Sequence, residues 1–266
     1  TKRQHATMNG QAAPGCARCS MSVVVPAYNE EKRLANMLRE AIQYLQRRQA
    51  SEAGFTWEVI VVDDGSRDRT RDVAARFSAE YGAENVSLIR LPRNCGKGFA
   101  VKEGMNAARG QLMLMVDADG ATRFADVERL EQHFRRHPAG KDAPLLVAGS
   151  RAHLQAAASV KRKWYRNFLM HAFHFLVTLA IGSEVKDTQC GFKLFGRSAG
   201  KRIFRNLNVR RWAFDVEVLH IAPRLGVEVV EEPVTWTEIA GSKMQVTGMA
   251  QMAKELLQIK ILHLLG

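Results

Sequence analysis

The chain has 266 residues, of which 46% are hydrophobic, enough to build the core of one large domain or two small ones. Its 39 Lys and Arg residues exceed its 27 Asp and Glu residues, and the net charge of +12 favours an anionic partner: nucleic acid, an anionic lipid surface or a phosphorylated ligand. No run of about 18 apolar residues is present, which excludes an obvious membrane-spanning helix within this sequence.

Taken in chain order, the sequence opens with a polar tail and then alternates between two kinds of segment. Residues 1–20 are small and polar and include Gly10, Pro14 and Gly15, which predicts a flexible tail. Short apolar segments typical of buried strands then alternate with longer segments of helical spacing. The strand-like segments are 21–26, 57–62, 86–91, 111–116, 145–149 and 227–234, and the helix-like segments are 30–49, 67–81 and 98–108. This alternation predicts a mostly parallel sheet with helices on both faces.

Chemically rich residues follow three of the predicted strands. They are the segments Pro26–Glu30, Asp63–Ser66 and Asp117–Asp119. Ligands of parallel sheets bind at the carboxyl ends of the strands, so the three segments predict a common binding site.

Each of these segments suggests a part of a nucleotide site, and each has a plainer alternative. Tyr28 offers a flat face for a base, although the segment is also typical of a strand–helix turn. A carboxylate of the Asp63–Asp64 pair can accept a hydrogen bond from the N–H of uracil; alternatively, the segment is a glycine turn that caps a helix through Ser66 or Asp68. Asp117 and Asp119 can hold Mg²⁺ or Mn²⁺ together with diphosphate oxygens; the alternative is a surface loop.

The segment Asn94–Gly98 invites comparison with a P-loop, but it lacks two of the required residues. Leu91 stands where the first glycine should be, and Gly98 stands where Ser or Thr should follow Lys97. We still expect Lys97 and backbone N–H groups of this loop near a phosphate.

The second half of the chain contains basic and apolar segments that suit a membrane surface. Lys161–Lys163 precede Trp164 and the apolar stretch Phe168–Ile181, whose 14 residues are too few to span a bilayer but fit an interfacial helix. An ordinary core helix is the alternative, and the amphipathic segment Met249–Leu265 poses the same choice. Cys16 and Cys19 form a C-x-x-C pair without the second pair that a zinc ribbon needs, so reduced, unpaired thiols are expected throughout the chain.

The order and spacing of these motifs resemble the inverting glycosyltransferases of family 2, which have the GT-A fold. The resemblance runs from about Met21 to the C-terminus and implies one domain over 21–266, with a nucleotide-binding half (about 21–123) and an acceptor, membrane-facing half (about 124–266). It also implies binding roles for residues of the three strand ends. Pro26, Tyr28, Glu30 and Asp64 would bind the nucleoside, Asp117 would contact the ribose and diphosphate, and Asp119 would bind the metal.

Further segments resemble the branch of this family that glucosylates dolichyl phosphate. They are Ser150–Arg151, Asp187–Lys193, Arg211–Glu217 and Trp236–Lys243, with Gly120–Arg123 after the D-x-D motif. The resemblance implies UDP-glucose as donor, dolichyl phosphate as acceptor, Mg²⁺ or Mn²⁺ as cofactor, and a role in N-glycosylation at the cytosolic face of the endoplasmic reticulum membrane. The family's N-terminal membrane helix is not within this sequence, so the mode of membrane attachment stays open.

The same resemblance implies roles in the acceptor half. Arg151 and Arg162 would hold the acceptor phosphate, Gln189 would contact that phosphate or the sugar, and Lys97 and Lys243 would lie at the donor phosphates. Asp215, the base in relatives with hydroxyl acceptors, would instead orient the sugar or the arginines. Asp187 would pair with the basic residues or serve the structure alone.

The sequence leaves three alternative functions beside this hypothesis. A mannosyltransferase or another polyprenyl-phosphate glycosyltransferase of the same fold would differ in donor or acceptor. A basic nucleic-acid-binding protein would suit the charge, but no RNP-like motif, zinc finger or helix-turn-helix signature is present, so we expect no nucleic-acid partner. An inactive nucleotide-sugar binder is disfavoured by the intact Asp117 and Asp119.

Overall fold

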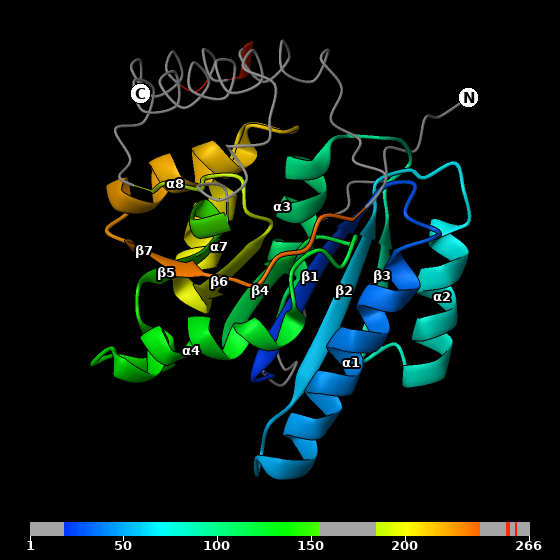
Figure 1. The fold of residues 1–266 in the computed structure, drawn as a ribbon. Coiled ribbons are helices and arrows are strands. Elements are labelled where there is room, and N and C mark those ends of the chain that lie inside the picture. The colour runs from blue at the N-terminus through cyan, green and yellow to red at the C-terminus, as the bar shows by residue number, and fades with distance from the viewer. Residues whose placement is uncertain (1–18, 155–184, 240–253, 256–258, 260–266) are drawn as a thin grey trace, which may run out of the picture.

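A seven-stranded sheet forms the centre of the computed structural model, which describes residues 19–154, 185–239, 254, 255 and 259 (Figure 1). The strand order is β3-β2-β1-β4-β6-β5-β7. Every neighbouring pair is parallel except those that β6 makes with β4 and β5. The strands are β1 (Met21–Ala27), β2 (Trp57–Asp63), β3 (Val86–Arg90), β4 (Leu112–Val116), β5 (Leu145–Ser150), β6 (Phe192–Gly196) and β7 (Glu228–Pro233). The expected mostly parallel sheet is confirmed.

Helices cover both faces of this sheet and divide the core into two clusters. One cluster contains buried residues of α1 (Leu34–Ser51), α2 (Thr70–Tyr81) and α4 (Val127–Arg136). The other contains buried residues of α3 (Lys97–Ala107), α7 (Arg197–Arg205) and α8 (Phe214–Arg224). Short 3-10 turns, η1 (Phe124–Asp126) and η2 (Gly140–Asp142), flank α4.

Strand β1 shows why the apolar runs of this sequence form buried strands. Val23 and Val25 belong to the first core cluster, whereas Val24 between them belongs to the second. Successive side chains of a strand point to opposite faces, and both faces are covered here, so the run is apolar throughout instead of alternating.

The apolar stripe predicted for the first helix is confirmed, but the helix begins later than its spacing indicates. Its members Leu34, Leu38, Ala41, Ile42 and Leu45 are all fully buried. The helix begins at Leu34 instead of residue 30, because residues 30–33 form a turn in which the N–H of Leu34 donates to the Glu30 carbonyl at 2.9 Å.

Four elements of the second half were not predicted: β6, α4, α7 and α8. Strand β6 has the sequence FKLFG, in which a lysine interrupts the apolar run, so its pattern is not that of a buried strand. It lies antiparallel between β4 and β5, which places Lys193 in the core.

Several expectations fall on other parts of the chain. Residues 1–18 of the predicted tail, the apolar stretch 164–182 and most of segment 249–265 lie outside the described residues. None of the helices in the described ranges combines the length and hydropathy that a bilayer crossing requires. Cys19, Cys95 and Cys190 are free thiols, as expected, and Cys16 is not among the described residues.

Candidate active site

A cavity of about 670 Å³ opens where the carboxyl ends of β1, β2 and β4 meet. Its volume lies within the range of about 300–1,000 Å³ that is typical of small-molecule sites. Ten of the predicted site residues line it: Pro26, Tyr28, Glu30, Asp64, Lys97, Asp117, Asp119, Arg151, Gln189 and Asp215. The other two, Arg162 and Lys243, lie outside the described residues. The expectation that the strand ends build a common site is therefore confirmed.

The two adjacent carboxylates after β2 serve different purposes. Asp63 accepts the N–H of Ser66 at 3.1 Å and so closes a local turn. Asp64 lines the cavity and accepts the N–H groups of Cys95 and Gly96 at 2.6 and 3.0 Å. Burial raises the pKa of Asp64, and these hydrogen bonds act in the opposite direction. Asp64 is thus the carboxylate of this pair that lines the cavity.

The loop that resembles a P-loop is used differently from a P-loop. The N–H groups of Cys95 and Gly96 donate to Asp64, and that of Gly98 donates to the Arg211 carbonyl at 3.1 Å, so these three groups are engaged within the chain. The expectation that other N–H groups of this loop lie near a phosphate stays a prediction. The glycines serve packing: a Cβ on Gly96 would lie 2.4 Å from the Arg210 carbonyl oxygen, and one on Gly98 would lie 2.6 Å from Cβ of Phe214. Lys97, between them, reaches into the cavity.

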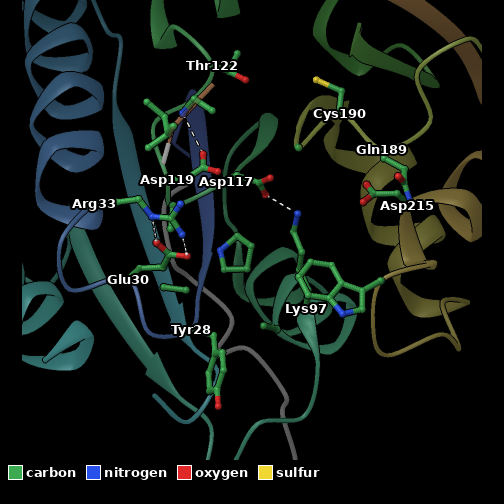
Figure 2. Close-up of a pocket in the computed structure, with 18 of the residues that line it drawn as sticks. Tyr28, Glu30, Arg33, Lys97, Asp117, Asp119, Thr122, Gln189, Cys190 and Asp215 are labelled. Carbon is green, nitrogen blue, oxygen red and sulfur yellow. Dashed lines mark hydrogen bonds and ion pairs between the residues drawn. The ribbon is translucent and has the colours of Figure 1, made fainter. Parts of the chain in front are cut away.

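Lys97 pairs with the first carboxylate of the D-x-D motif (Figure 2). Its Nζ lies 2.7 Å from Oδ1 of Asp117. Burial acts to lower the pKa of Lys97, but the carboxylates of Asp117 and Asp215 outweigh it and the pKa is raised. The ammonium therefore stays charged and lies next to the place expected for a diphosphate.

Asp119 has the properties of a carboxylate that can bind a divalent cation. One of its oxygens accepts the N–H of Ala121 at 3.0 Å, and the residue lines the cavity. Burial and the charge of Asp117 raise the pKa of Asp119, so an added cation would stabilise its ionised form. Within the described ranges no three His, Cys, Asp or Glu residues cluster as a metal cage. Mg²⁺ is often held in proteins by one or two carboxylates together with substrate phosphates and water, a role for which Asp119 has the right chemistry.

The backbone just before β6, at Gly191, fixes the position of Asp117. The N–H of Asp117 donates to the Gly191 carbonyl at 3.0 Å. A Cβ on Gly191 would lie 2.1 Å from Oδ2 of Asp117, so only glycine leaves room for the carboxylate in this position.

Arg151, at the end of β5, is fixed by a buried carboxylate. Its Nε and Nη2 donate to the two oxygens of Asp187 at 2.7 and 2.9 Å, and its backbone N–H donates to the same carboxylate at 2.8 Å. Burial would raise the pKa of Asp187, but Arg151 outweighs burial and holds it below the usual value. The expected pairing of Asp187 with a basic residue is confirmed. The Arg151 guanidinium also lies 5.5 Å from the ring centroid of Trp236.

Asp215 is buried at the start of α8 and is paired with a lysine from β6. Nζ of Lys193 donates to Oδ1 of Asp215 at 2.7 Å and to the carbonyls of Cys190 and Thr188 at 2.6 and 3.2 Å. Burial raises the pKa of Asp215, whereas Lys193 and Lys97 act to lower it. The fully buried ammonium thereby ties the loop before β6 to this carboxylate.

Other residues line the cavity without having been assigned a role from the sequence. They include Arg33, Arg211, Trp212, Trp236 and Glu238. Arg211, Trp212 and Trp236 stand in segments that carry the family resemblance, which was a usable signal. Arg33 stands three residues after Glu30, a spacing that brings side chains of opposite charge together at the start of a helix.

A short backbone pairing joins the two halves of the cavity. The N–H of Thr237 donates to the Ala121 carbonyl at 2.8 Å, and the N–H of Arg123 donates to the Thr235 carbonyl at 3.1 Å. The turn after the D-x-D motif is therefore bonded to the segment that carries Trp236, which contacts Arg151.

Known proteins share sequence similarity with most of this chain. The family model described as "Glycosyl transferase family 2" matches residues 22–204. The chain is similar to dolichyl-phosphate beta-glucosyltransferase of Mus musculus, at 49% identity over 92% of this chain and 76% of the relative. It is also similar to the enzyme of that name from Saccharomyces cerevisiae, at 40% identity over 92% of this chain and 75% of the relative.

Solved structures support the fold alone. Glucosyl-3-phosphoglycerate synthase from Mycobacterium tuberculosis in complex with UDP has a TM-score of 0.61 at 16% identity, over 94% of this chain and 85% of that chain. A second structure of the same synthase, with Mn²⁺, UDP and glucosyl-3-phosphoglycerate, has a TM-score of 0.59 at 18% identity, over 91% of this chain and 78% of that chain.

Proposed function

This chain belongs to glycosyltransferase family 2, and from that premise we propose that it transfers glucose from UDP-glucose to dolichyl phosphate and releases UDP. The observation that carries the proposal is the joint lining of one cavity by Asp64, Asp119 and Arg151. The first two suit a nucleoside and a metal-bound diphosphate, and the third suits an acceptor phosphate. The names of the relatives support this choice of donor sugar and acceptor.

The proposed reaction is one in-line displacement at the anomeric carbon of glucose. A phosphate oxygen of the acceptor forms the new bond to this carbon, the bond to the UDP oxygen breaks, and the configuration inverts. A phosphate monoester has a second pKa of about 6, so it is mostly a dianion at neutral pH and needs orientation more than deprotonation.

Arg151 would orient the acceptor. Two of its guanidinium nitrogens are engaged by Asp187, and this pairing presets the plane in which the remaining N–H groups can meet a phosphate. Arg162, which the resemblance assigns to the same phosphate, would assist it.

On the donor side, Asp119 with Asp117 beside it would hold the divalent cation, whose chemistry is to neutralise charge on the leaving diphosphate. Lys97 lies 2.7 Å from Asp117 and would place a further positive charge there. Lys243 is assigned to the same phosphates by resemblance.

Asp215 would act in orientation and not as a base. Its carboxylate is tied to Lys193 at 2.7 Å, and a dianionic nucleophile has no proton to give up. The negative charge of Asp215 stabilises the protonated form of Lys97, because it helps to raise the pKa of Lys97.

The proposal includes the membrane at which the reaction would take place. An isoprenoid acceptor requires a membrane surface, and the net charge of +12 suits anionic headgroups. We assign the enzyme to the cytosolic face of the endoplasmic reticulum membrane, where its product would serve as a glucose donor for N-glycosylation.

Transfer of labelled glucose from UDP-glucose to dolichyl phosphate tests the proposal. The assay is run in detergent with Mg²⁺ or Mn²⁺, beside an Asp119→Ala variant. Lipid-extractable label that disappears in the variant is the expected result. No label, with UDP-glucose still bound, would point to another acceptor, and no binding of UDP would refute the proposal.

A further inference from the structure

Arg33 is a cavity-lining cation with no role assigned by the sequence motifs or the family resemblance. Its side chain is 17% exposed and forms a bidentate pair with Glu30: Nε lies 2.7 Å from Oε2, and Nη2 lies 2.7 Å from Oε1. A pair of this kind fixes both the position and the plane of a guanidinium.

The backbone that carries this pair is itself held firmly. The N–H of Glu30 donates to Oγ1 of Thr70 at 2.6 Å, which ties the turn after β1 to the start of α2. The N–H of Arg33 donates to the Glu30 carbonyl at 3.0 Å, and α1 begins at the next residue. These two hydrogen bonds fix the short turn from which the side chains of Glu30 and Arg33 both extend.

The guanidinium of Arg33 has N–H groups besides the two that Glu30 engages, and it lies on the side of the cavity that carries Asp119 (Figure 2). Glu30 engages two N–H groups of the guanidinium, and within the described part of the chain no other acceptor engages the rest. Figure 2 shows Arg33 between Glu30 and Asp119. The charge of Arg33 also acts to lower the pKa of Asp119 against the effect of burial, as expected for neighbours.

Two cations thus flank the D-x-D motif. Lys97 pairs with Asp117 at 2.7 Å, and Arg33 lies near Asp119; in the view of Figure 2 they stand on either side of the two carboxylates. All four residues Glu30, Arg33, Asp64 and Asp119 line the same cavity, and Arg33 therefore lies close to the place proposed for the donor diphosphate.

We propose that Arg33 is a donor-binding residue that donates hydrogen bonds to the diphosphate of the nucleotide sugar, and that Glu30 positions it. This inference rests on the proposed function only for the presence of a nucleoside diphosphate in the cavity. Charge-assisted bonds from a preset fork match the oxygens of a phosphate group, which a lysine would meet only as a point charge.

Binding of UDP and of uridine to two Arg33 variants tests the inference. Arg33→Gln removes the charge, and Arg33→Lys keeps the charge but removes the fork. The matched control is Arg39→Gln, because Arg39 is an exposed arginine of α1, the helix that follows Arg33, and donates to Asn36 three residues earlier. UDP affinity is measured by calorimetry with Mn²⁺ present, and uridine affinity by NMR titration.

We expect Arg33→Gln to weaken UDP binding by about 10- to 100-fold, the range for a lost hydrogen bond to a charged group, and to leave uridine binding within about twofold. The UDP affinity of Arg33→Lys should fall between those of the wild type and Arg33→Gln, and the UDP affinity of Arg39→Gln should equal that of the wild type. An equal loss for uridine and UDP would overturn the proposal in favour of a nucleoside or structural role, and unchanged UDP binding would overturn it outright. If the wild type itself fails to bind UDP, the proposed function fails first.

Discussion

Replacing Gly191 by alanine tests whether the position of Asp117 governs activity. A Cβ at residue 191 would lie 2.1, 2.2 and 2.5 Å from Oδ2, Cγ and Oδ1 of Asp117. Carbon and oxygen atoms that are not bonded normally stay more than about 3 Å apart, so the carboxylate must move by about 1 Å. The side chain is about one-third exposed and can turn into the cavity, so the fold should survive the change.

Gly191→Ala should lower the rate of glucose transfer more than it lowers the stability of the fold. A shift of this size breaks the 2.7 Å contact between Asp117 and Lys97 and displaces the D-x-D motif that would hold the diphosphate and its cation. Misplacement by about 1 Å commonly costs about 100-fold in rate, which is the loss we expect in kcat/KM for glucose transfer. The free energy of unfolding should change by less than about 1 kcal/mol.

Gly226→Ala provides the matched control. Gly226 has φ +64° and no atom within 4 Å of an added Cβ, so alanine there meets no neighbour but strains the backbone. This variant should lose about 1 kcal/mol of stability and keep its activity. Transfer kinetics and urea unfolding of both variants separate the two effects. Full activity in a well-folded Gly191→Ala protein would refute the reasoning.

Three further predictions concern the buried pairs and the metal. Lys193→Met should cost about 3–5 kcal/mol in urea unfolding, since it leaves the buried carboxylate of Asp215 without its lysine, and Asp215→Leu in the same chain should restore part of that loss. Arg151 holds the pKa of Asp187 below its usual value, so the stability from this pair is present above about pH 4 and is lost as the pH falls through the depressed pKa. The stability difference between wild type and Asp187→Asn should therefore be constant from neutral pH to about pH 5 and shrink in stronger acid; a constant difference down to about pH 2 would contradict this. Chelation with EDTA should abolish transfer, and added Mg²⁺ or Mn²⁺ should restore it; full activity in EDTA would exclude a metal at Asp119.

The sequence was most informative where local pattern and fold agree. Val23–Val25 lie in a buried parallel strand, and such strands are apolar on both faces. Ligand-binding residues follow these strands, so the motifs at Pro26, Asp64 and Asp117 could be joined into one site before any coordinates were considered.

Long-range pairing could not be read from the sequence. Lys193 looks like a solvent-exposed lysine until β6 is placed between β4 and β5, where its ammonium meets Asp215. The family resemblance pointed to Asp64 and not Asp63, but the contact that holds Asp64, a hydrogen bond from the N–H of Cys95 31 residues further along the chain, could not be read from the sequence. Such contacts depend on tertiary packing and leave no periodic signal.

A comparison of donors tests the proposed glucose transfer most directly. Labelled UDP-glucose and labelled GDP-mannose are offered separately to the enzyme with dolichyl phosphate in the same detergent and metal, and lipid-extractable label is counted. We expect label from UDP-glucose, in a product with inverted (β) configuration, and none above background from GDP-mannose. Label from GDP-mannose alone would contradict this expectation and assign the chain to a different donor.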